Sequence, residues 1–282
     1  RNRGVYFTGE GVDLNRAISN RIDKRAAGAA GLGTGIDLAN GDRNVFSNNT
    51  LTGFGGGVSV FFANSNRIMN YTFVSNANGV NLWGAIPIRN EIRGNTIDGR
   101  GNRQRGLQVF DGPQFTVISN NTVYGHVLAG IYLSAGGSGP NRNRIAGNIA
   151  RSNGRYGIFI GGPDSDTNTV VSNSIDGAGY QTNGIYIVDS DRNVVTNNRV
   201  WRNLRAGVVL TNTAASNRVV GNTIGTNAGR GIRVHGDTAD ANRLAENRVE
   251  GRSATGYGIE IVDADRNIVT NNSVVDPGAW GI

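Results

Sequence analysis

A four-residue run of the form Gly-Ile-x-Val, in which other aliphatic residues can replace Ile and Val, returns along almost the whole chain. Consecutive glycines of this run lie 22 to 27 residues apart. That interval is too short for a strand, crossover helix and second strand, which need roughly 30 residues, but it suits one coil of a solenoid. The run begins at Gly35, Gly57, Gly79, Gly106, Gly130, Gly157, Gly184, Gly207, Gly231 and Gly258.

A second pattern, Asn-x-Ile-x-x-Asn-x-Ile, follows the Gly-led run and predicts a further strand, as at residues 193–200. A buried carboxamide has two donor hydrogens and an acceptor oxygen to satisfy. Stacking identical amides one coil above another supplies those partners, so we expect an asparagine ladder in which Tyr71 is the one substitute. Its members are Asn20, Asn49, Asn95, Asn121, Asn148, Asn173, Asn198, Asn222, Asn247 and Asn272.

Apolar and variable residues alternate within each Gly-led run, which is the period of a β-strand. The aliphatic residues are therefore expected to point inward and the third residue of each run outward. Parallel coils about 4.8 Å apart then form a rod with a narrow, dry, aliphatic interior. The sequence predicts an all-β fold, a right-handed parallel β-helix (a solenoid) of about 11 coils with an asparagine ladder.

The repeat continues from residue 1 to residue 282 without a linker or low-complexity tract, which predicts a single domain. Gly281 and Ile282 open a coil that the sequence does not finish, and Arg1 stands where a start Met would be expected. We therefore expect a fragment or a trimmed chain. The 43 glycines agree with a chain that turns sharply several times in each coil.

The absence of cysteine excludes disulfides, thiolate metal sites and a cysteine nucleophile. No apolar stretch reaches the roughly 18 residues that a membrane-spanning helix needs, so no membrane span is predicted. Composition leaves the oligomeric state open.

The formal net charge is +7, and because Lys24 is the single lysine among 28 cationic residues, the other 27 are arginines. Guanidinium groups bind carboxylate, sulfate or phosphate through a planar fork, which favours an acidic polymer as partner. The alternative is a structural role on a solvated face, because many arginines directly follow an Asn of the second pattern. No recognition helix or basic and aromatic tract is present, so nucleic acid is not predicted as a partner. These repeated arginines include Arg67, Arg144, Arg218 and Arg243.

With these repeats the sequence resembles the right-handed parallel β-helix repeat family of the pectate-lyase-like superfamily, over essentially its whole length. The resemblance implies action on or binding to a polysaccharide, and a secreted, periplasmic or cell-surface location. Because the repeat encodes the scaffold and not a site, it does not specify the activity. Two classes of relative stay open: polysaccharide enzymes such as mannuronan C5-epimerases, and periplasmic accessory or adhesin-like rods.

Large aromatic residues occupy outward positions of the Gly-led strands, where exposure to water is costly. They indicate either a groove in which sugar rings stack or a surface that loops or another subunit cover. Equivalent positions on successive coils predict that the rings of Tyr132, Phe159 and Tyr186 stack as a ladder. Trp83, Phe110, Tyr132 and Phe159 are the candidate substrate-binding aromatics, with Glu260 as a polar candidate.

The sharpest candidate catalytic cluster is formed by Arg233, His235 and Asp237 on one coil, together with Tyr186 two coils earlier. His exchanges protons near neutral pH, a Tyr hydroxyl can act from the opposite face, and Arg neutralises a uronate carboxylate so that its α-proton becomes acidic. These roles suit β-elimination or C5-epimerisation. The alternative is that His235 is an ordinary surface residue.

Motif comparison narrows the choice. Mannuronan C5-epimerases carry Tyr-Gly-x-Asp-Pro-His on the equivalent strand, and residues 230–235 match that pattern at Gly231 and His235, with Arg230, Arg233 and Val234 in place of Tyr, Asp and Pro. The motifs of polygalacturonases and pectate lyases are absent. The sequence therefore favours a lyase or epimerase acting on an acidic polysaccharide over a glycoside hydrolase. A non-catalytic carbohydrate-binding or structural rod is the second hypothesis.

Paired acids occur at several corners, and two carboxylates can hold Ca²⁺ or flank a glycosidic bond. However, nearly the same hexapeptide appears at residues 188–193 and 262–267, which indicates Asp side chains that accept backbone hydrogen bonds in tight turns. No metal site or cofactor is assigned, and Ca²⁺ stays open. The pairs are Asp164 with Asp166, Asp189 with Asp191, and Asp263 with Asp265.

Overall fold

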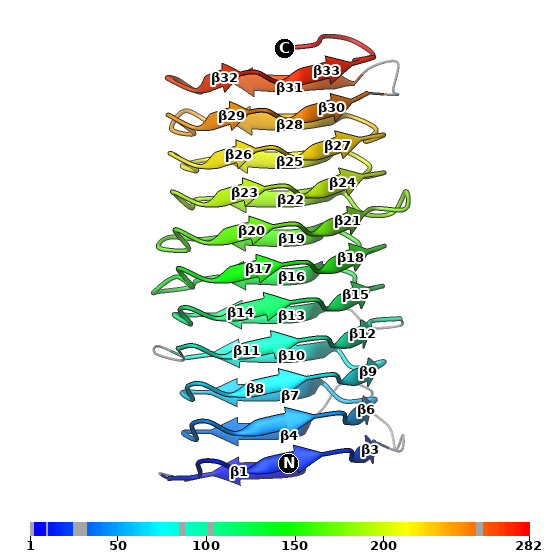
Figure 1. Ribbon diagram of the computed structural model, residues 1–282, viewed down its shortest axis with the longest axis vertical. Helices are drawn as coiled ribbons and strands as arrows, with labels where there is room; N and C mark the ends of the chain where they lie inside the picture. The colour runs from blue at the N-terminus through cyan, green and yellow to red at the C-terminus, as the bar shows by residue number, and fades with distance from the viewer. Residues whose placement is uncertain (1–2, 10, 25–32, 85–87, 101–103, 252–255) are drawn as a thin grey trace.

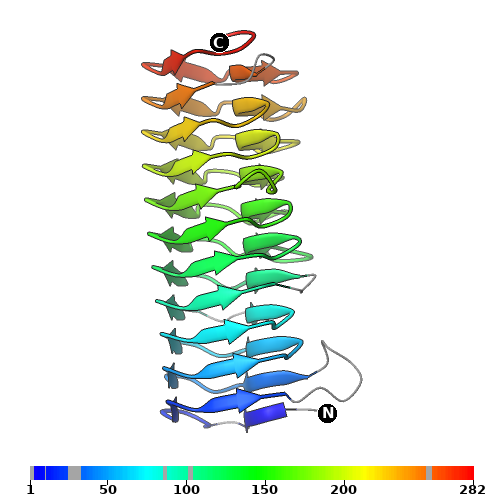
Figure 2. The ribbon, with the colours of Figure 1, turned by 90° about the vertical axis from the view of Figure 1, so that its right-hand side faces the viewer.

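The computed structural model describes residues 3–9, 11–24, 33–84, 88–100, 104–251 and 256–282. The described residues form three parallel sheets of 11 strands each and contain no helix. Strands that are neighbours in a sheet are three apart in chain order, because each coil gives one strand to every sheet before the next coil begins (Figure 1). The predicted parallel β-helix is confirmed, and Figure 2 shows its coils stacked as a rod with the termini at opposite ends.

We name the sheets A, B and C in the order in which the chain reaches them. Sheet A holds β1 (Arg3–Thr8), β4 (Thr34–Ala39), β7 (Gly56–Phe61), β10 (Asn78–Trp83), β13 (Arg105–Phe110), β16 (Ala129–Ser134), β19 (Tyr156–Gly161), β22 (Asn183–Val188), β25 (Ala206–Thr211), β28 (Arg230–His235) and β31 (Tyr257–Val262). Sheet B holds β2 (Arg16–Ile18), β5 (Val45–Ser47), β8 (Arg67–Met69), β11 (Glu91–Arg93), β14 (Val117–Ser119), β17 (Arg144–Ala146), β20 (Thr169–Val171), β23 (Val194–Thr196), β26 (Arg218–Val220), β29 (Arg243–Ala245) and β32 (Ile268–Thr270). Sheet C holds β3 (Arg21–Asp23), β6 (Thr50–Thr52), β9 (Thr72–Val74), β12 (Thr96–Asp98), β15 (Thr122–Tyr124), β18 (Ile149–Arg151), β21 (Ser174–Asp176), β24 (Arg199–Trp201), β27 (Thr223–Gly225), β30 (Arg248–Glu250) and β33 (Ser273–Val275).

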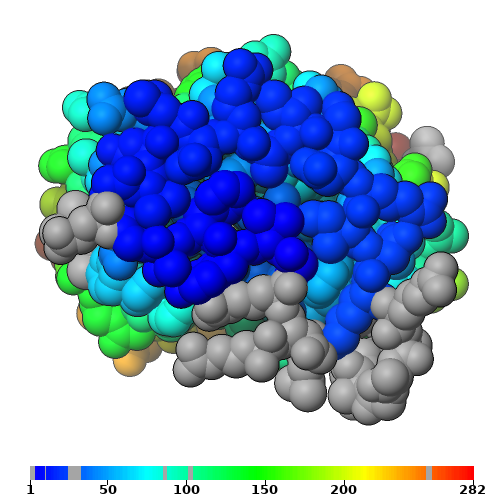
Figure 3. All heavy atoms as spheres, turned by 90° about the horizontal axis from the view of Figure 1, so that it is seen from below, coloured from blue at the N-terminus to red at the C-terminus, as the bar shows by residue number. Residues whose placement is uncertain are grey.

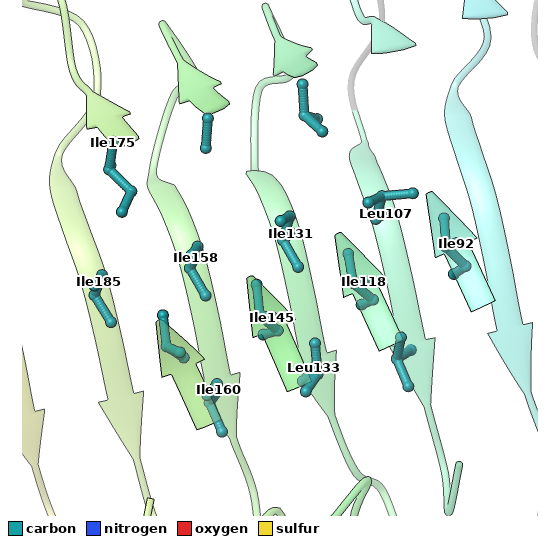
Figure 4. Packing of buried hydrophobic residues seen from close by; sticks show 14 of the residues in the cluster. Ile92, Leu107, Ile118, Ile131, Leu133, Ile145, Ile158, Ile160, Ile175 and Ile185 are labelled. Carbon is teal, nitrogen blue, oxygen red and sulfur yellow. The ribbon is translucent and has the colours of Figure 1, made fainter. Parts of the chain in front are cut away.

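The core is a column of aliphatic side chains that lie in register from coil to coil. Ile131, Ile158 and Ile185 pair directly across sheet A and are fully buried. Side chains from sheets B and C, such as Ile145 and Ile175, meet them inside the rod (Figure 4). Seen from the N-terminal end, atoms of the first coils cover most of the cross-section, so the interior is filled by side chains and is not an open channel (Figure 3).

The repeat glycine points inward, together with the residue after it. A Cβ added to Gly184 would lie 2.2 Å from Val200 Cγ1 and 2.5 Å from the carbonyl oxygen of Gly207 in the next coil. Most other repeat glycines meet a core side chain and the next glycine's carbonyl in the same way. The strict alternation of the strand is therefore interrupted at the glycine, and the residue before it faces outward on sheet A.

The asparagine ladder between sheets B and C is confirmed. The side-chain amino group of Asn173 donates to the oxygen of Asn198 in the next coil at 3.0 Å and to the carbonyl of Ile145 in the previous coil at 2.9 Å. The oxygen of Asn173 accepts from the backbone and side-chain nitrogens of Asn148, each at 2.9 Å. Tyr71 takes one place in this ladder, where its buried backbone N–H still donates to the Asn95 oxygen at 2.9 Å.

Similar amide stacks occupy the other two corners. Between sheets A and B, Asn168 donates its backbone N–H to the Asn193 oxygen at 2.8 Å, and the series extends on both sides. Between sheets C and A, Asn203 bonds to Asn227 in the same manner. His126 occupies an equivalent place in this third series, fully buried, and donates its backbone N–H to the Asn153 oxygen at 3.2 Å. All three corners are thus held from within by side-chain amides.

Candidate functional site

A groove of about 580 Å³ lies on the outer face of sheet A, across β19, β22, β25 and β28. Turn residues just before these strands, including Arg155 and Arg205, form part of its edge. Its central side chains are Tyr156, Tyr186, Val209, Arg230, Arg233 and His235.

The register of three neighbouring strands explains why the surface is hollowed here. Tyr186 pairs with Val209, and Val209 pairs with Arg233. Because adjacent strands are about 4.8 Å apart, the backbones of Tyr186 and Arg233 are separated by about 10 Å. The short side chain of Val209 forms the floor between these two longer side chains.

Glu260 holds two of the groove's arginines. Arg230 donates to its carboxylate through two nitrogens, at 2.9 and 3.2 Å, and Arg233 Nε lies 2.8 Å from the same carboxylate. One negative charge therefore faces two positive charges. Since Arg155 and Arg205 also line the groove and no Asp or Glu does, its described lining is strongly cationic.

Two tyrosines form one wall, and their rings are in contact at a centroid distance of 4.8 Å. Burial raises the pKa of both hydroxyls above the ordinary value of 10, and for Tyr186 the nearby Arg233 opposes that rise. Both side chains therefore keep their protons at neutral pH. In chemical terms they are hydrogen-bond or proton donors, not tyrosinate bases.

His235 ends β28 and lines the groove with a side chain that is 41% exposed. Its Nδ1 lies 4.0 Å from the Asp263 carboxylate in the next coil, which is beyond hydrogen-bond distance. Asp237 is exposed in the turn after β28 and is not among the lining residues. The structure thus gathers His235, Arg233 and Tyr186 in one groove and leaves Asp237 outside it.

The predicted aromatic ladder is confirmed. The rings of Tyr132 and Phe159 stack at 4.5 Å, and those of Phe159 and Tyr186 stack at 6.0 Å, in both cases within 8° of parallel. Tyr132 and Phe159 therefore extend the surface of sheet A from the groove toward the N-terminal end. Trp83 and Phe110 lie further along, in a separate hollow of about 250 Å³.

Sequence reasoning missed Arg230 and Tyr156, although both are central to the groove. Each directly precedes a repeat glycine, a position that strict alternation from the glycine assigns to the interior. The run of Arg, Tyr and Asn at this position in several coils was a usable signal, because such residues are rarely buried in an aliphatic column.

The arginines divide between two faces. Those that follow an Asn of the second pattern lie on the outer face of sheet B, where Arg67 Nε lies 2.8 Å from Glu91 and Arg218 is exposed. That distribution fits the structural reading for the repeated arginines. The arginines of the groove lie on sheet A and belong to a different part of the repeat.

The acids at the corners mostly serve the turns, as predicted. Asp166 accepts the backbone N–H of Asp191 at 2.7 Å, and Asp191 accepts that of Ala215 at 2.8 Å. Asp240 accepts the backbone N–H of Asp265 in the same way, at 2.8 Å. Within the described ranges, no group of three or more His, Cys, Asp or Glu side chains is arranged to hold a metal ion. The part of the chain that the structure describes also has no helix suited to crossing a membrane.

With this geometry established, comparison with known proteins places the chain in a family. A family model described as periplasmic copper-binding protein (NosD) matches residues 1–179 and, in an overlapping second match, residues 138–278. The chain belongs to the NosD family. Comparison of this NosD-family chain with curated proteins gives no match.

Several solved structures share the fold of this NosD-family chain. The periplasmic alginate epimerase AlgG is 16% identical, with a TM-score of 0.68 over 86% of this chain and 69% of that one. The A-module of the Azotobacter vinelandii mannuronan C-5 epimerase AlgE4 is 15% identical, with a TM-score of 0.65 over 99% and 88%. DFA-IIIase from Arthrobacter chlorophenolicus A6 is 14% identical, with a TM-score of 0.61 over 88% and 66%. At these identities the likeness establishes the fold alone.

Proposed function

We propose that the groove on sheet A binds an acidic polysaccharide and acts on its uronate residues as a lyase or C5-epimerase. The observation that carries the proposal is the charge of the groove: four arginines and no carboxylate belong to its lining. Arginine forks suit planar carboxylates, and a cationic cleft concentrates an anionic polymer. The solved epimerases with this fold, whose titles name alginate and mannuronan, support the same class of substrate.

Arg233 is the proposed carboxylate clamp. It approaches Glu260 through Nε, and no hydrogen bond from its terminal nitrogens occurs among the described residues, which leaves them for a ligand. Neutralising a uronate carboxylate acidifies the hydrogen on the adjacent C5 carbon, because the electron pair left on C5 delocalises into the carboxylate.

His235 and Tyr186 are the proposed proton-transfer pair. His235 removes the C5 proton, and the C–H electron pair moves into the carboxylate group as an enolate. In epimerisation, Tyr186 returns a proton to C5 from the opposite face. In elimination, the pair forms a C4–C5 double bond, the C4–O bond breaks, and Tyr186 protonates the leaving oxygen. The raised pKa of Tyr186 supports this donor role.

Copper, which the family description names, has a poor set of donors here. The chain has no Cys and a single methionine, Met69, which lies on sheet B. Its two histidines lie far apart along the rod, with His126 buried between β15 and β16 and His235 at the end of β28. Since soft sulfur ligands or clustered imidazoles favour copper, we derive no step through copper.

The experiment is incubation with polymannuronate, polyguluronate and polygalacturonate in D₂O. Deuterium entering at C5, seen by NMR, reports proton abstraction. Added ultraviolet absorbance then indicates elimination, and inverted sugars indicate epimerisation. We expect Tyr186→Phe to lower the rate about a hundredfold while binding changes little, and Arg218→Ala on sheet B to act as the wild type. Exchange that persists in both His235→Gln and Tyr186→Phe contradicts the assigned roles.

A non-catalytic polysaccharide-binding rod is the second candidate. It is favoured by the surroundings of His235, because the nearest carboxylate, on Asp263, is 4.0 Å away and cannot fix the imidazole by a hydrogen bond. Saturable binding of polyuronates without any C5 exchange supports this candidate over the enzyme.

We infer a periplasmic or cell-surface location for the protein. The family description supports the periplasm, and acidic polysaccharides are polymers of the cell envelope and exterior. Cell fractionation of a strain that expresses the full-length gene tests this location, and recovery in the cytoplasm contradicts it.

A further inference from the structure

The hollow beside Trp83 differs from the arginine groove in every chemical respect. It has a volume of about 250 Å³ and lies over β7, β10 and β13, five coils before β28 on sheet A. Trp83 and Phe110 are adjacent in register, but the Trp83 ring packs against Phe61 on its other side, with centroids 4.2 Å apart. No ring contact joins Trp83 to Phe110 among the described residues, and the hollow lies between them.

Three carboxamides line this hollow: Asn78, Asn81 and Gln108. Asn78 Oδ1 accepts the backbone N–H of Arg105 at 3.1 Å, and Gln108 Oε1 accepts from the Arg105 side chain at 3.5 Å. Asn81 Oδ1 is buried and has no hydrogen-bond partner in the described part of the chain. A buried acceptor without a partner is costly, so this atom is suited to a donor hydroxyl of a ligand.

No ionisable side chain lines the hollow. The closest cation along sheet A, Arg105, is drawn away by the next coil, where its guanidinium lies over the Tyr132 ring at 4.0 Å from the centroid. A carboxylate would therefore find no counter-charge here. The hollow instead offers an aromatic face that is 45% exposed, amide donors and an unpaired acceptor.

We propose that this hollow is a binding site for a neutral saccharide. A pyranose ring combines an apolar C–H face, which packs on the Trp83 indole, with hydroxyls that both donate and accept hydrogen bonds. One hydroxyl donates to Asn81 Oδ1, and the amino group of Gln108 donates to another oxygen. The site uses none of the residues of the arginine groove, so it stands whether or not the proposed uronate chemistry does.

The test is titration calorimetry of the whole protein with neutral oligosaccharides of β-1,4-linked glucose, mannose and N-acetylglucosamine, and with oligouronates of matched length. We expect at least one neutral series to bind and Trp83→Ala to weaken that binding about tenfold or more. Asn81→Leu, which keeps the size but removes the acceptor, is expected to act in the same direction. Trp201→Ala on sheet C and Arg233→Ala in the groove are expected to leave neutral binding unchanged.

The proposal is overturned if no neutral oligosaccharide binds, or if Trp83→Ala and Trp201→Ala have equal effects. It is also overturned if Trp83→Ala removes oligouronate binding alone. Loss of oligouronate binding in Arg233→Ala concerns only the proposed function of the groove, so failure of either proposal is recognised separately. Melting temperatures of the variants, compared with the wild type, show whether a loss of binding reflects unfolding.

Discussion

Arg233 lies across from Glu260 in the next coil, and its Nε is 2.8 Å from the carboxylate. Because Arg230 donates two hydrogen bonds to the same group, Glu260 both orders the two guanidinium groups and neutralises half of their charge. The carboxylate therefore competes with any anion that approaches the groove.

Glu260→Gln is expected to strengthen polyuronate binding by about three- to tenfold at low salt, because the groove gains one net positive charge. The gain should shrink as salt increases, since screening weakens interactions between exposed charges. Calorimetric titration at two ionic strengths measures both effects. Weaker binding by this variant would instead mean that Glu260 acts mainly by positioning the arginines.

Gly184→Ala is expected to destabilise the fold by at least about 2 kcal/mol, because the new methyl group would overlap a core side chain and a carbonyl of the next coil. The contacts of 2.2 Å and 2.5 Å leave no room for a small shift. Gly137→Ala is the matched control, since a Cβ there meets nothing within 4 Å. Urea unfolding compares the two variants, and equal midpoints would contradict the inward placement of the repeat glycine.

Asn173→Leu is expected to cost about 3 kcal/mol or more, because ladder partners in the coils on both sides lose hydrogen bonds and cannot reach water. The exposed Asn197, which has a positive φ of 54°, provides a control. Asn197→Gly should change stability by less than about 0.5 kcal/mol. A melting temperature unaffected by Asn173→Leu would count against a stabilising role for the ladder.

His126 should make the fold acid-sensitive. Burial lowers its pKa from 6.5 to about 4, against a smaller opposing contribution from the Ile97 backbone. Between these values the unfolded chain binds more protons than the folded one, so the stabilisation is complete above pH 6.5 and is lost as the pH falls toward 4.

That loss amounts to roughly 3 kcal/mol from this one residue. His126→Asn, which places the usual ladder residue at this corner, should show a shallower fall in unfolding free energy between neutral pH and acid. Urea titrations of both proteins at several pH values measure the slopes, and parallel slopes would remove His126 as the cause.

Much of the fold was predictable from the sequence, because a coil of this size tolerates little variation. Aliphatic alternation identified Ile158 and Ile185 as inward residues, and the last Asn of the second pattern identified the ladder through Asn173. The other two amide stacks escaped prediction. Their residues, such as Asn168 and Asn203, are spaced by corners whose geometry no strand period specifies.

The candidate site was predictable only in part. Tyr186 and Arg233 were found because both follow a repeat glycine by two residues and therefore share a row. Arg230 was missed because the glycine itself turns inward, which reverses the direction assigned to its predecessor. Asp237 was grouped with His235 by closeness in sequence, but Gly236, at a φ of 128°, lies between them and begins the turn that leaves Asp237 outside the groove.

The in-register stacking of sheet A also makes the rod a ruler. Every coil adds the same increment of about 4.8 Å, so the gap between the Trp83 hollow and the arginine groove is fixed by the count of repeats that separates them. Duplication or deletion of one repeat would move the two surfaces apart or together by a single step while altering neither. Selection can in this way match the protein to a ligand of another length without redesigning any contact.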